Sequence, residues 1–271
     1  MNHLSPLSSE APPIRNPKSE IRNPKVALVT GGAKRVGRAV ALTLAQAGMD
    51  IAITYRRSAD EAKQVVRDIE ALGRRALAIR VDLAKADAAE RVYAAFTRRF
   101  DRLDALINNA SVFAAARLGS ITPADLESQW AVNARAPMLL IQRFAPMLAA
   151  HADVRHPATL GRIVNFIDIH VMGQPLRGYL PYNMSKAALM ELTMTAAMEL
   201  APQVTVNAIA PGVVAWADAY TPAMKQAYLK RVPLARPGTP HDAAAAVLFL
   251  VRDAHYCTGQ IIRLDGGRLL T

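Results

Sequence analysis

The stretch VALVTGGAKRVG, residues 26–37, decides the fold of this chain. It opens with a short apolar run typical of a buried strand, continues through glycines, and leads into apolar positions of helical period. Glycines let the backbone turn tightly and approach a pyrophosphate, and the free N–H groups at a helix start attract its charge. The stretch predicts a strand, a phosphate-binding turn and a helix, the alternative being a plain βα turn. The residues predicted at the phosphates are Gly31, Lys34, Arg35, Val36 and Gly37.

Short apolar runs and longer amphipathic runs go on alternating to the C-terminus. The strand-like runs lie at 50–55, 76–82, 105–110, 162–167, 204–211 and 260–267. Helical runs lie at 35–47, 59–72, 86–100, 182–200 and 240–251, with a long helix beginning near 122–123. This alternation predicts an α/β fold: one Rossmann-like domain over 26–271, with a doubly wound parallel sheet and helices on both faces. Ligands of such sheets bind outside the carboxyl ends of the strands.

Residues 1–25 differ from the rest of the chain. They are rich in proline, serine and charge, and they contain the repeat IRNPKSE followed by IRNPK. Such a segment buries too little apolar surface to order itself, so we expect a disordered tail. The repeat also suggests a start codon assigned too early.

Composition limits the class of protein. Over 271 residues, 52% are hydrophobic and the formal net charge is +11. The basic residues are scattered rather than gathered in a polybasic block, which disfavours nucleic acid as a partner. No apolar run is long enough for a membrane span, and the single cysteine, Cys257, agrees with a reducing compartment. We expect a cytoplasmic enzyme without a metal site, acting on a small molecule.

The end of the second strand predicts the dinucleotide. An NAD-binding protein usually presents a carboxylate to the ribose hydroxyls there, whereas this chain has Tyr55, Arg56, Arg57 and Ser58. A guanidinium binds a 2′-phosphate in bidentate fashion, and a serine hydroxyl donates to it. These residues favour NADPH over NADH, the alternative being a solvated basic helix start.

Two further strand ends complete the predicted cofactor site. Asp82, followed by Leu83, is placed to contact the adenine edge, although an acidic residue there is equally explained as a helix cap. Asn109, Ala110 and Ser111 follow the fourth strand and are expected beside the adenosine ribose.

A spacing of four residues joins Tyr182 to Lys186, so both side chains project from one face of a helix. A free phenol has a pKa near 10, and an ammonium beside it favours the phenolate and lowers that pKa. The pair indicates an activated proton-transfer group, against the alternative of an ordinary solvated helix face.

Together these motifs resemble the short-chain dehydrogenase/reductase family. The resemblance rests on the glycine-rich turn, the NNAS run at 108–111, Asn133, Tyr182 with Lys186, Pro211-Gly212 and the closing LDGG at 264–267. It implies that Tyr182 donates the proton, that Lys186 binds the nicotinamide ribose, and that Asn133 helps hold a relay water. It also implies that Pro211 and Gly212 contact the cofactor, and that the chain forms a homotetramer through the helices bearing Asn133 and Tyr182.

At two positions the chain departs from the general family pattern, and in both it resembles the pteridine reductase branch. Arg35 replaces the middle glycine of the turn, and Asp168 occupies the position of the usual catalytic serine. The local runs GGAKRVGRA, YRRSADEA and NNASVF agree with this branch, as does QPL at 174–176 followed by Gly178-Tyr179. Asp168 lies one residue further from Tyr182 than that pattern has, so His170 is the alternative for the serine position.

The chemistry of these substitutions points to a pterin. An ionised aspartate accepts hydrogen bonds and opposes a developing oxyanion, so it suits a substrate that presents N–H groups. Phe113 would stack on the flat ring, unless it packs on the core instead, and Arg35 would bridge the ring to the phosphates, unless it serves the pyrophosphate alone. The predicted substrate-binding residues are Arg35, Ser111, Phe113, Asp168, Tyr179 and Tyr182.

The sequence therefore predicts an NADPH-dependent reductase that transfers hydride to a C=N bond of a dihydropterin or dihydrofolate, with Tyr182 as proton donor. The predicted catalytic residues are Tyr182, Lys186, Asp168 and Asn133. One alternative is a ketone or 3-oxoacyl thioester reductase of the same family, and a remote one is a noncatalytic NADPH-binding regulator.

Overall fold

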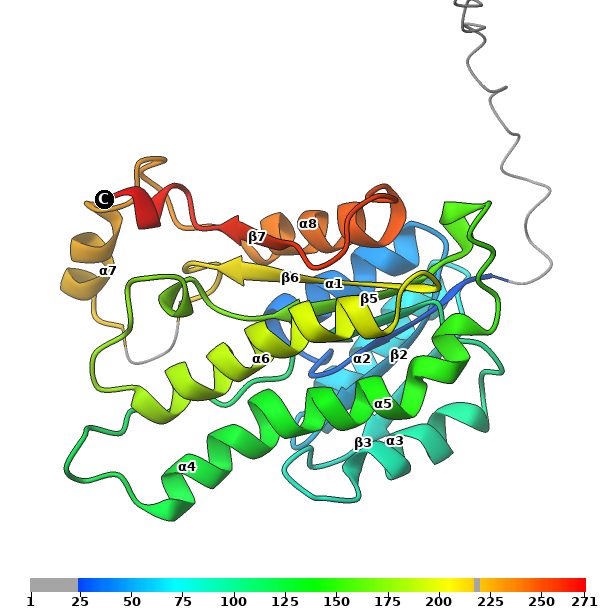
Figure 1. Cartoon of the computed structure of the whole chain (residues 1–271), viewed down its shortest axis with the longest axis horizontal. Helices are drawn as coiled ribbons and strands as arrows, with labels where there is room; N and C mark the ends of the chain where they lie inside the picture. The colour runs from blue at the N-terminus through cyan, green and yellow to red at the C-terminus, as the bar shows by residue number, and fades with distance from the viewer. Residues whose placement is uncertain (1–23, 217–219) are drawn as a thin grey trace, which may run out of the picture.

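The computed structural model describes residues 24–216 and 220–271 (Figure 1). The tail predicted for residues 1–25 falls, up to residue 23, outside the described residues. In the described part of the chain, no helix is long and apolar enough to cross a membrane.

In the described residues, seven parallel strands form a single sheet at the centre of the molecule (Figure 1). Its order is β3-β2-β1-β4-β5-β6-β7, so the direction of winding reverses between β1 and β4. The strands are β1 (Val26–Val29), β2 (Asp50–Tyr55), β3 (Ala76–Arg80), β4 (Ala105–Asn108), β5 (Gly161–Phe166), β6 (Val204–Pro211) and β7 (Ile261–Leu264). The predicted doubly wound, Rossmann-like sheet is confirmed, and its reversal places a ligand crevice at the carboxyl ends of β1 and β4.

Helices cover both faces of the sheet, as predicted. Figure 1 shows α5 and α6 on one side of it and α1 and α8 on the other. The helices are α1 (Arg35–Gln46), α2 (Ala59–Ala71), α3 (Ala88–Thr97), α4 (Pro123–Trp130), α5 (Ala136–Ala149), α6 (Leu180–Glu199), α7 (Pro222–Leu229) and α8 (Pro240–Arg252). Shorter helical turns are η2 (Ala131–Arg135), η3 (Pro157–Thr159), η4 (Ile169–Val171) and η5 (Arg268–Leu270).

Alternate residues of the central strand β1 belong to two separate cores, one on each face of the sheet. In β1, Ala27 and Val29 pack with the buried faces of α1, α2 and α8, whereas Val26 and Leu28 pack with those of α3, α5 and α6. Fully burying a Val or Leu side chain contributes about 2 kcal/mol, so strands apolar on both faces are stable only between two helical layers. This two-layer cover fixes the strand ends that carry the site.

The long helix predicted from 122–123 is interrupted. Thr122 and Asp125 cap its start reciprocally, which confirms that boundary. The run then passes from α4 through one π-helical turn, η2, into α5, and Asn133 lies in that turn. Single π turns inside helices occur frequently at functional sites.

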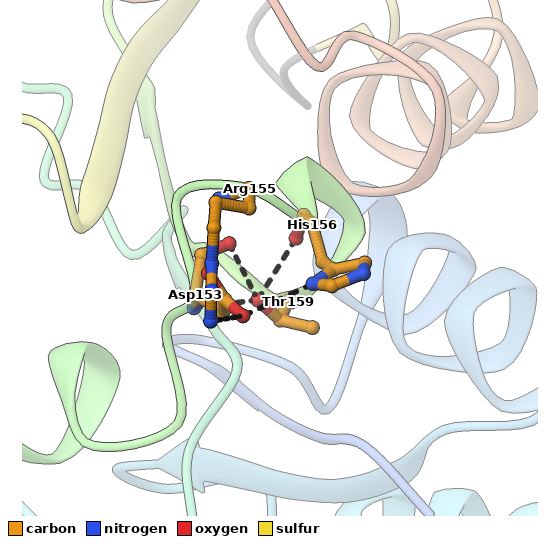
Figure 2. A network of polar contacts seen from close by, with 4 residues as sticks. All are labelled: Asp153, Arg155, His156 and Thr159. Atoms are coloured by element: carbon orange, nitrogen blue, oxygen red, sulfur yellow. Dashed lines mark hydrogen bonds and ion pairs between the residues drawn. The ribbon is translucent and has the colours of Figure 1, made fainter.

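A polar network closes the loop between α5 and β5 (Figure 2). The carboxylate of Asp153 accepts hydrogen bonds from the side chains of Arg155 and His156, and Thr159 Oγ1 donates to the His156 carbonyl at 2.9 Å. The hydrogen bonds that Asp153 accepts, first from the Arg155 side chain and then from His156, hold the pKa of its carboxyl far below the usual range. The loop precedes β5 and so lies at the amino ends of the strands, away from the crevice.

Candidate active site

Thr30 and Asn109 join the ends of β1 and β4 at the point where the sheet reverses. Thr30 Oγ1 accepts the backbone N–H groups of Asn109 and Ala110, each at 3.0 Å, and Asn109 Nδ2 donates to the Thr30 carbonyl at 2.8 Å. These bonds hold the Asn109 loop against the glycine-rich turn. Thr30 was not among the predicted site residues, although its place at the end of the first strand is a signal for it.

A cavity of about 480 Å³ opens beside this junction. Fourteen of the predicted site residues line it: Gly31, Lys34, Arg35, Val36, Gly37, Asn109, Ala110, Ser111, Phe113, Asp168, Tyr182, Lys186, Pro211 and Gly212. His170, the alternative to Asp168, lines it too. Sequence reasoning missed Phe166, Ile167, Leu176, Val213, Val214, Ala215, Tyr220 and Tyr228.

The glycine-rich turn has the geometry of a phosphate cradle. Gly31 has φ +64°, a conformation that favours glycine, and a Cβ on Gly37 would lie 2.2 Å from the Gly31 carbonyl oxygen. No side chain caps the start of α1 at Lys34. The backbone N–H groups of that first turn therefore remain available to an anion.

Arg35 occupies the middle of this turn with φ +50°, where a side chain is strained by on the order of 1–3 kcal/mol. Its guanidinium donates to the backbone carbonyls of Ala215 at 2.8 Å and Trp216 at 2.7 Å. Arg35 thus links the turn to the segment after β6. Sequence reasoning placed this side chain at the phosphates and the substrate, and it did not predict the link.

The basic residues after β2 lie beside the cavity rather than in its lining. Gly31 N–H donates to Thr54 Oγ1 at 3.1 Å, which brings the end of β2 against the turn. The exposed guanidinium groups of Arg56 and Arg57 make no ion pair or hydrogen bond with any described residue. The Ser58 hydroxyl makes no capping bond at the start of α2. Tyr55 is half-buried at the end of β2 and, like its three neighbours, does not line the cavity.

Lys34 lies between the turn and α2. Its ammonium forms an ion pair of 2.6 Å with Glu61 in the first turn of α2, and this hydrogen bond lowers the pKa of the Glu61 carboxyl. One predicted phosphate ligand is therefore held by a carboxylate of the chain itself.

Asp82 and Leu83 do not reach the cavity. Asp82 Oδ1 accepts the backbone N–H of Ala84 at 3.0 Å, which is the contact expected of a local cap. The Leu83 side chain is buried in the core that includes α3 and α5. The cap interpretation of Asp82 has a contact in the structure, and the cofactor contacts of Asp82 and Leu83 stay predictions.

Asp168, rather than His170, meets the tyrosine. The Tyr182 hydroxyl donates to Asp168 Oδ2 at 2.7 Å, while Asp168 Oδ1 accepts the backbone N–H of His170 at 2.9 Å. The second bond starts η4 and fixes the carboxylate. His170 Nδ1 instead lies 2.7 Å from the Gln174 carbonyl oxygen.

The pKa expected for the tyrosine is wrong in sign. Burial raises the pKa of the Tyr182 hydroxyl well above 10, and the charge and hydrogen bond of Asp168 raise it further. Lys186 Nζ donates to the Phe166 carbonyl at 2.7 Å and lies 5.9 Å from the Tyr182 ring centroid. The carboxylate is in contact with the phenol and the ammonium is not, so the phenol keeps its proton.

Lys186 is itself perturbed. Burial lowers its pKa from 10.5 to about 8, although the charge of Asp168 opposes this effect. Its ammonium lines the cavity and makes one hydrogen bond with the described residues, to Phe166. Two of its three donor positions are therefore left for a ligand.

Asn133 is a fully buried positioning residue. Its Oδ1 accepts from Ser111 Oγ and the Val112 N–H, at 3.1 and 2.8 Å. Its Nδ2 donates to the Val112 carbonyl and to Ser185 Oγ, at 2.9 and 3.0 Å. The side chain has no hydrogen bond left for the predicted relay water. It ties the loop after β4 to α6, the helix of Tyr182.

Three aromatic rings meet beside the cavity. Phe113 stacks on Tyr179, with centroids 4.4 Å apart, and lies edge-on to Tyr182 at 4.8 Å. Phe113 remains 40% exposed, so it is not a core residue of the loop. Tyr179 covers one face of Phe113 and does not itself line the cavity.

Comparisons with known proteins agree with this architecture. A family model described as enoyl-(acyl carrier protein) reductase matches residues 31–268. A 3-oxoacyl-[acyl-carrier-protein] reductase of Staphylococcus epidermidis is 35% identical, over 90% of this chain and 98% of that protein. A protein of the same description from Synechocystis is 34% identical, over 91% and 97%. The crystal structure of acetoin dehydrogenase from Enterobacter cloacae has a TM-score of 0.80 at 33% identity, covering 92% of this chain and 97% of that one.

The chain belongs to the short-chain dehydrogenase/reductase family, and it is an oxidoreductase.

Proposed function

We propose that this chain is an NADPH-dependent reductase that delivers hydride to a C=N bond of a dihydropterin. The observation that carries the proposal is the hydrogen bond from Tyr182 to Asp168. A carboxylate in contact with the proton donor changes which substrates the site accepts.

A carbonyl substrate is poorly served by this pair. Its oxygen gains negative charge during hydride transfer, and it needs two donors beside it. The Tyr182 hydroxyl is one, but Asp168 is an acceptor that opposes the charge. A pterin presents an amino group and ring N–H groups to the carboxylate, and its ring nitrogen takes the proton.

The aromatic rings support the same substrate. Phe113 lines the cavity with one face already supported by Tyr179, so it is held as a rigid wall. A flat heterocycle beside such a wall gains from stacking as well as from burial.

Reduction of a ketone or a 3-oxoacyl thioester is the second candidate. The names of the relatives from Staphylococcus and Synechocystis favour it, since both are described as 3-oxoacyl-[acyl-carrier-protein] reductases. Identities near one third across a whole domain leave room for a change of substrate, and the substrate is set by the site rather than by the fold.

The residues at the turn fit a dinucleotide. Gly37 lies so close to the Gly31 carbonyl that no side chain fits there. No side chain caps the first turn of α1, so its backbone N–H groups are available. The Lys186 ammonium has two N–H donors left for a ligand in the cavity. The free guanidinium groups of Arg56 and Arg57 favour the 2′-phosphate of NADPH. When bound, the nicotinamide supplies the hydride.

The chain's own residues hold the proton, orient the hydroxyl that carries it and position the ligand. Tyr182 holds the proton, because burial and the Asp168 carboxylate both favour the neutral phenol and raise its pKa. Asp168 orients that hydroxyl and accepts from substrate N–H groups. Lys186 donates to the ligand in the cavity, and Asn133 keeps the loop after β4 in register with α6.

We also propose association into a homotetramer through the helices bearing Asn133 and Tyr182. These helices expose large apolar side chains, which are costly to leave in water: Leu126, Trp130, Met138, Met184 and Met194. Light scattering is expected to give four times the chain mass, and the mass of a single chain would contradict this.

A substrate panel tests the proposed activity. With NADPH, kcat/KM is measured for dihydrobiopterin, dihydromonapterin, dihydrofolate, acetoacetyl thioester and simple ketones. We expect the dihydropterins to lead. Fast reduction of the thioester with no reduction of dihydrobiopterin would favour the second candidate, and no turnover of any compound would favour a noncatalytic NADPH-binding regulator.

A further inference from the structure

One side chain, that of Gln174, joins three segments that lie far apart in the sequence. Its Oε1 accepts from Arg268 Nη1 at 2.8 Å and from Arg231 Nη2 at 3.3 Å. Its Nε2 donates to the Thr271 carbonyl at 3.0 Å. Gln174 thus ties the loop before α6 both to the residues after α7 and to those after β7.

The loop that carries Gln174 forms part of the cavity wall, through Asp168, His170 and Leu176. His170 Nδ1 lies 2.7 Å from the Gln174 carbonyl oxygen, and since a carbonyl only accepts, that nitrogen carries the proton. The His170 N–H in turn donates to Asp168 Oδ1 at 2.9 Å. A displacement of Gln174 would therefore reach the carboxylate that orients Tyr182.

Tyr228 belongs to another part of the same wall, and both arginines that bind Gln174 also contact it. The Arg268 guanidinium carbon lies 5.5 Å from the centre of the Tyr228 ring, and the Arg231 N–H donates to the Tyr228 carbonyl at 3.0 Å. The Tyr228 hydroxyl accepts the Val213 N–H at 3.1 Å. Gln174 is thus linked, through two arginines, to a second segment that lines the cavity.

Burial makes this link costly to lose. Arg268 is 5% exposed, and its side chain makes one hydrogen bond with the described residues, the one to Gln174. Its Nε has no partner among those residues. Without the Gln174 oxygen the guanidinium would keep its charge in a buried place with no acceptor, which is strongly unfavourable.

We propose that Gln174 and Arg268 are positioning residues, which hold the 168–176 and Tyr228 parts of the cavity wall in register and so set the fit of the substrate. The inference rests on the proposed function in taking this cavity as the substrate site. It holds for a pterin or a thioester alike, because it concerns the spacing of the wall.

The test compares two substitutions of the same glutamine. Gln174→Met removes the hydrogen bonds of the side chain at similar length, whereas Gln174→Glu keeps an acceptor for both arginines. In Gln174→Met we expect KM for the reduced substrate, dihydrobiopterin or acetoacetyl thioester, to rise about tenfold, as for a slightly misplaced positioning group. Gln174→Glu should restore most of this loss. The Kd for NADPH should stay unchanged in both, because the glycine-rich turn and Lys186 do not contact Gln174.

Gln203→Met is the matched control, an exposed glutamine before β6, and should leave KM and Kd unchanged. An unchanged KM in Gln174→Met would overturn the inference. An equal loss in Gln174→Glu, or a parallel rise in the Kd for NADPH, would do so too, because the effect would then not come from the acceptor or not be confined to the substrate.

Hydrogen exchange separates this inference from the proposed activity, since it needs no substrate. We expect residues 168–176 and 228–232 to exchange faster together in Gln174→Met and as in the wild type in Gln174→Glu. A wild type that reduces neither compound would overturn the proposed activity alone. Unchanged exchange, or faster exchange in one segment only, would overturn the link between the two parts of the wall.

Discussion

The hydroxyl of Tyr182 and the carboxylate of Asp168 share one hydrogen bond of 2.7 Å inside the cavity. Asp168 is fixed at its other oxygen by the backbone of His170, so the tyrosine is oriented by the chain itself. In the proposed reaction this contact sets the charge around the transferred proton, and the choice of substrate depends on it.

Replacing Tyr182 by phenylalanine removes the proposed proton donor and keeps the ring against Phe113. We expect kcat to fall by about 10²–10⁴, the range for loss of a general acid. The Kd for NADPH should stay within a few fold, because the donors of Lys186 and the turn remain. Stopped-flow and fluorescence titration measure the two quantities, and a variant that retains full kcat would remove Tyr182 from the proton path.

The lowered pKa of Lys186 should make the free energy of unfolding rise with pH. Its pKa is about 8 when folded and near 10.5 when unfolded, so between these values the unfolded chain binds more protons. The free energy of unfolding of the wild type should therefore rise with pH relative to that of Lys186→Met, by about 1.4 kcal/mol per pH unit. Denaturant unfolding of both proteins from pH 8 to 10 measures the difference. A flat or falling difference would contradict a buried, perturbed ammonium.

Charges around the end of β2 should set the choice of dinucleotide. Arg57→Asp places a carboxylate at the expected 2′-phosphate, so KM for NADPH should rise far more than KM for NADH.

Glu61→Gln is the opposite change, because it releases Lys34 from its ion pair. This substitution should lower KM for NADPH by a few fold, as for an exposed ion pair, and should lower KM for NADH less. Steady-state KM values with both dinucleotides provide the measurement, and equal changes for both would argue against a 2′-phosphate site here.

Much of the fold, and the meeting of many predicted site residues in one cavity, could be predicted, since they depend on local pattern. Strands apolar on both faces require two helical layers, and glycines at positions such as Gly31 and Gly37 reflect backbone geometry that no other residue replaces well. The positions of Tyr182 and Lys186 on one helix face follow from helical spacing alone. Such features need no knowledge of distant contacts.

Features that depend on distant contacts were missed. Arg35 reaches the carbonyls of Ala215 and Trp216, far away in the chain, and no local pattern marks those partners. Tyr228 lines the cavity from α7, in a segment whose sequence indicated only irregular structure. The sign of the Tyr182 pKa shift could not be read from spacing, because it depends on burial and on Asp168 lying nearer than Lys186.

The central claim is that Asp168 selects a C=N substrate, and Asp168→Ser tests it most directly. The serine restores a donor beside Tyr182, whereas Asp168→Asn, the matched control, removes the charge with little change in size. The measured quantity is the ratio of kcat/KM for dihydrobiopterin to that for acetoacetyl thioester, with NADPH. We expect this ratio to fall by about 10² or more in Asp168→Ser, through slower pterin reduction and faster carbonyl reduction. An unchanged ratio, or a wild type that already prefers the thioester, would contradict the account.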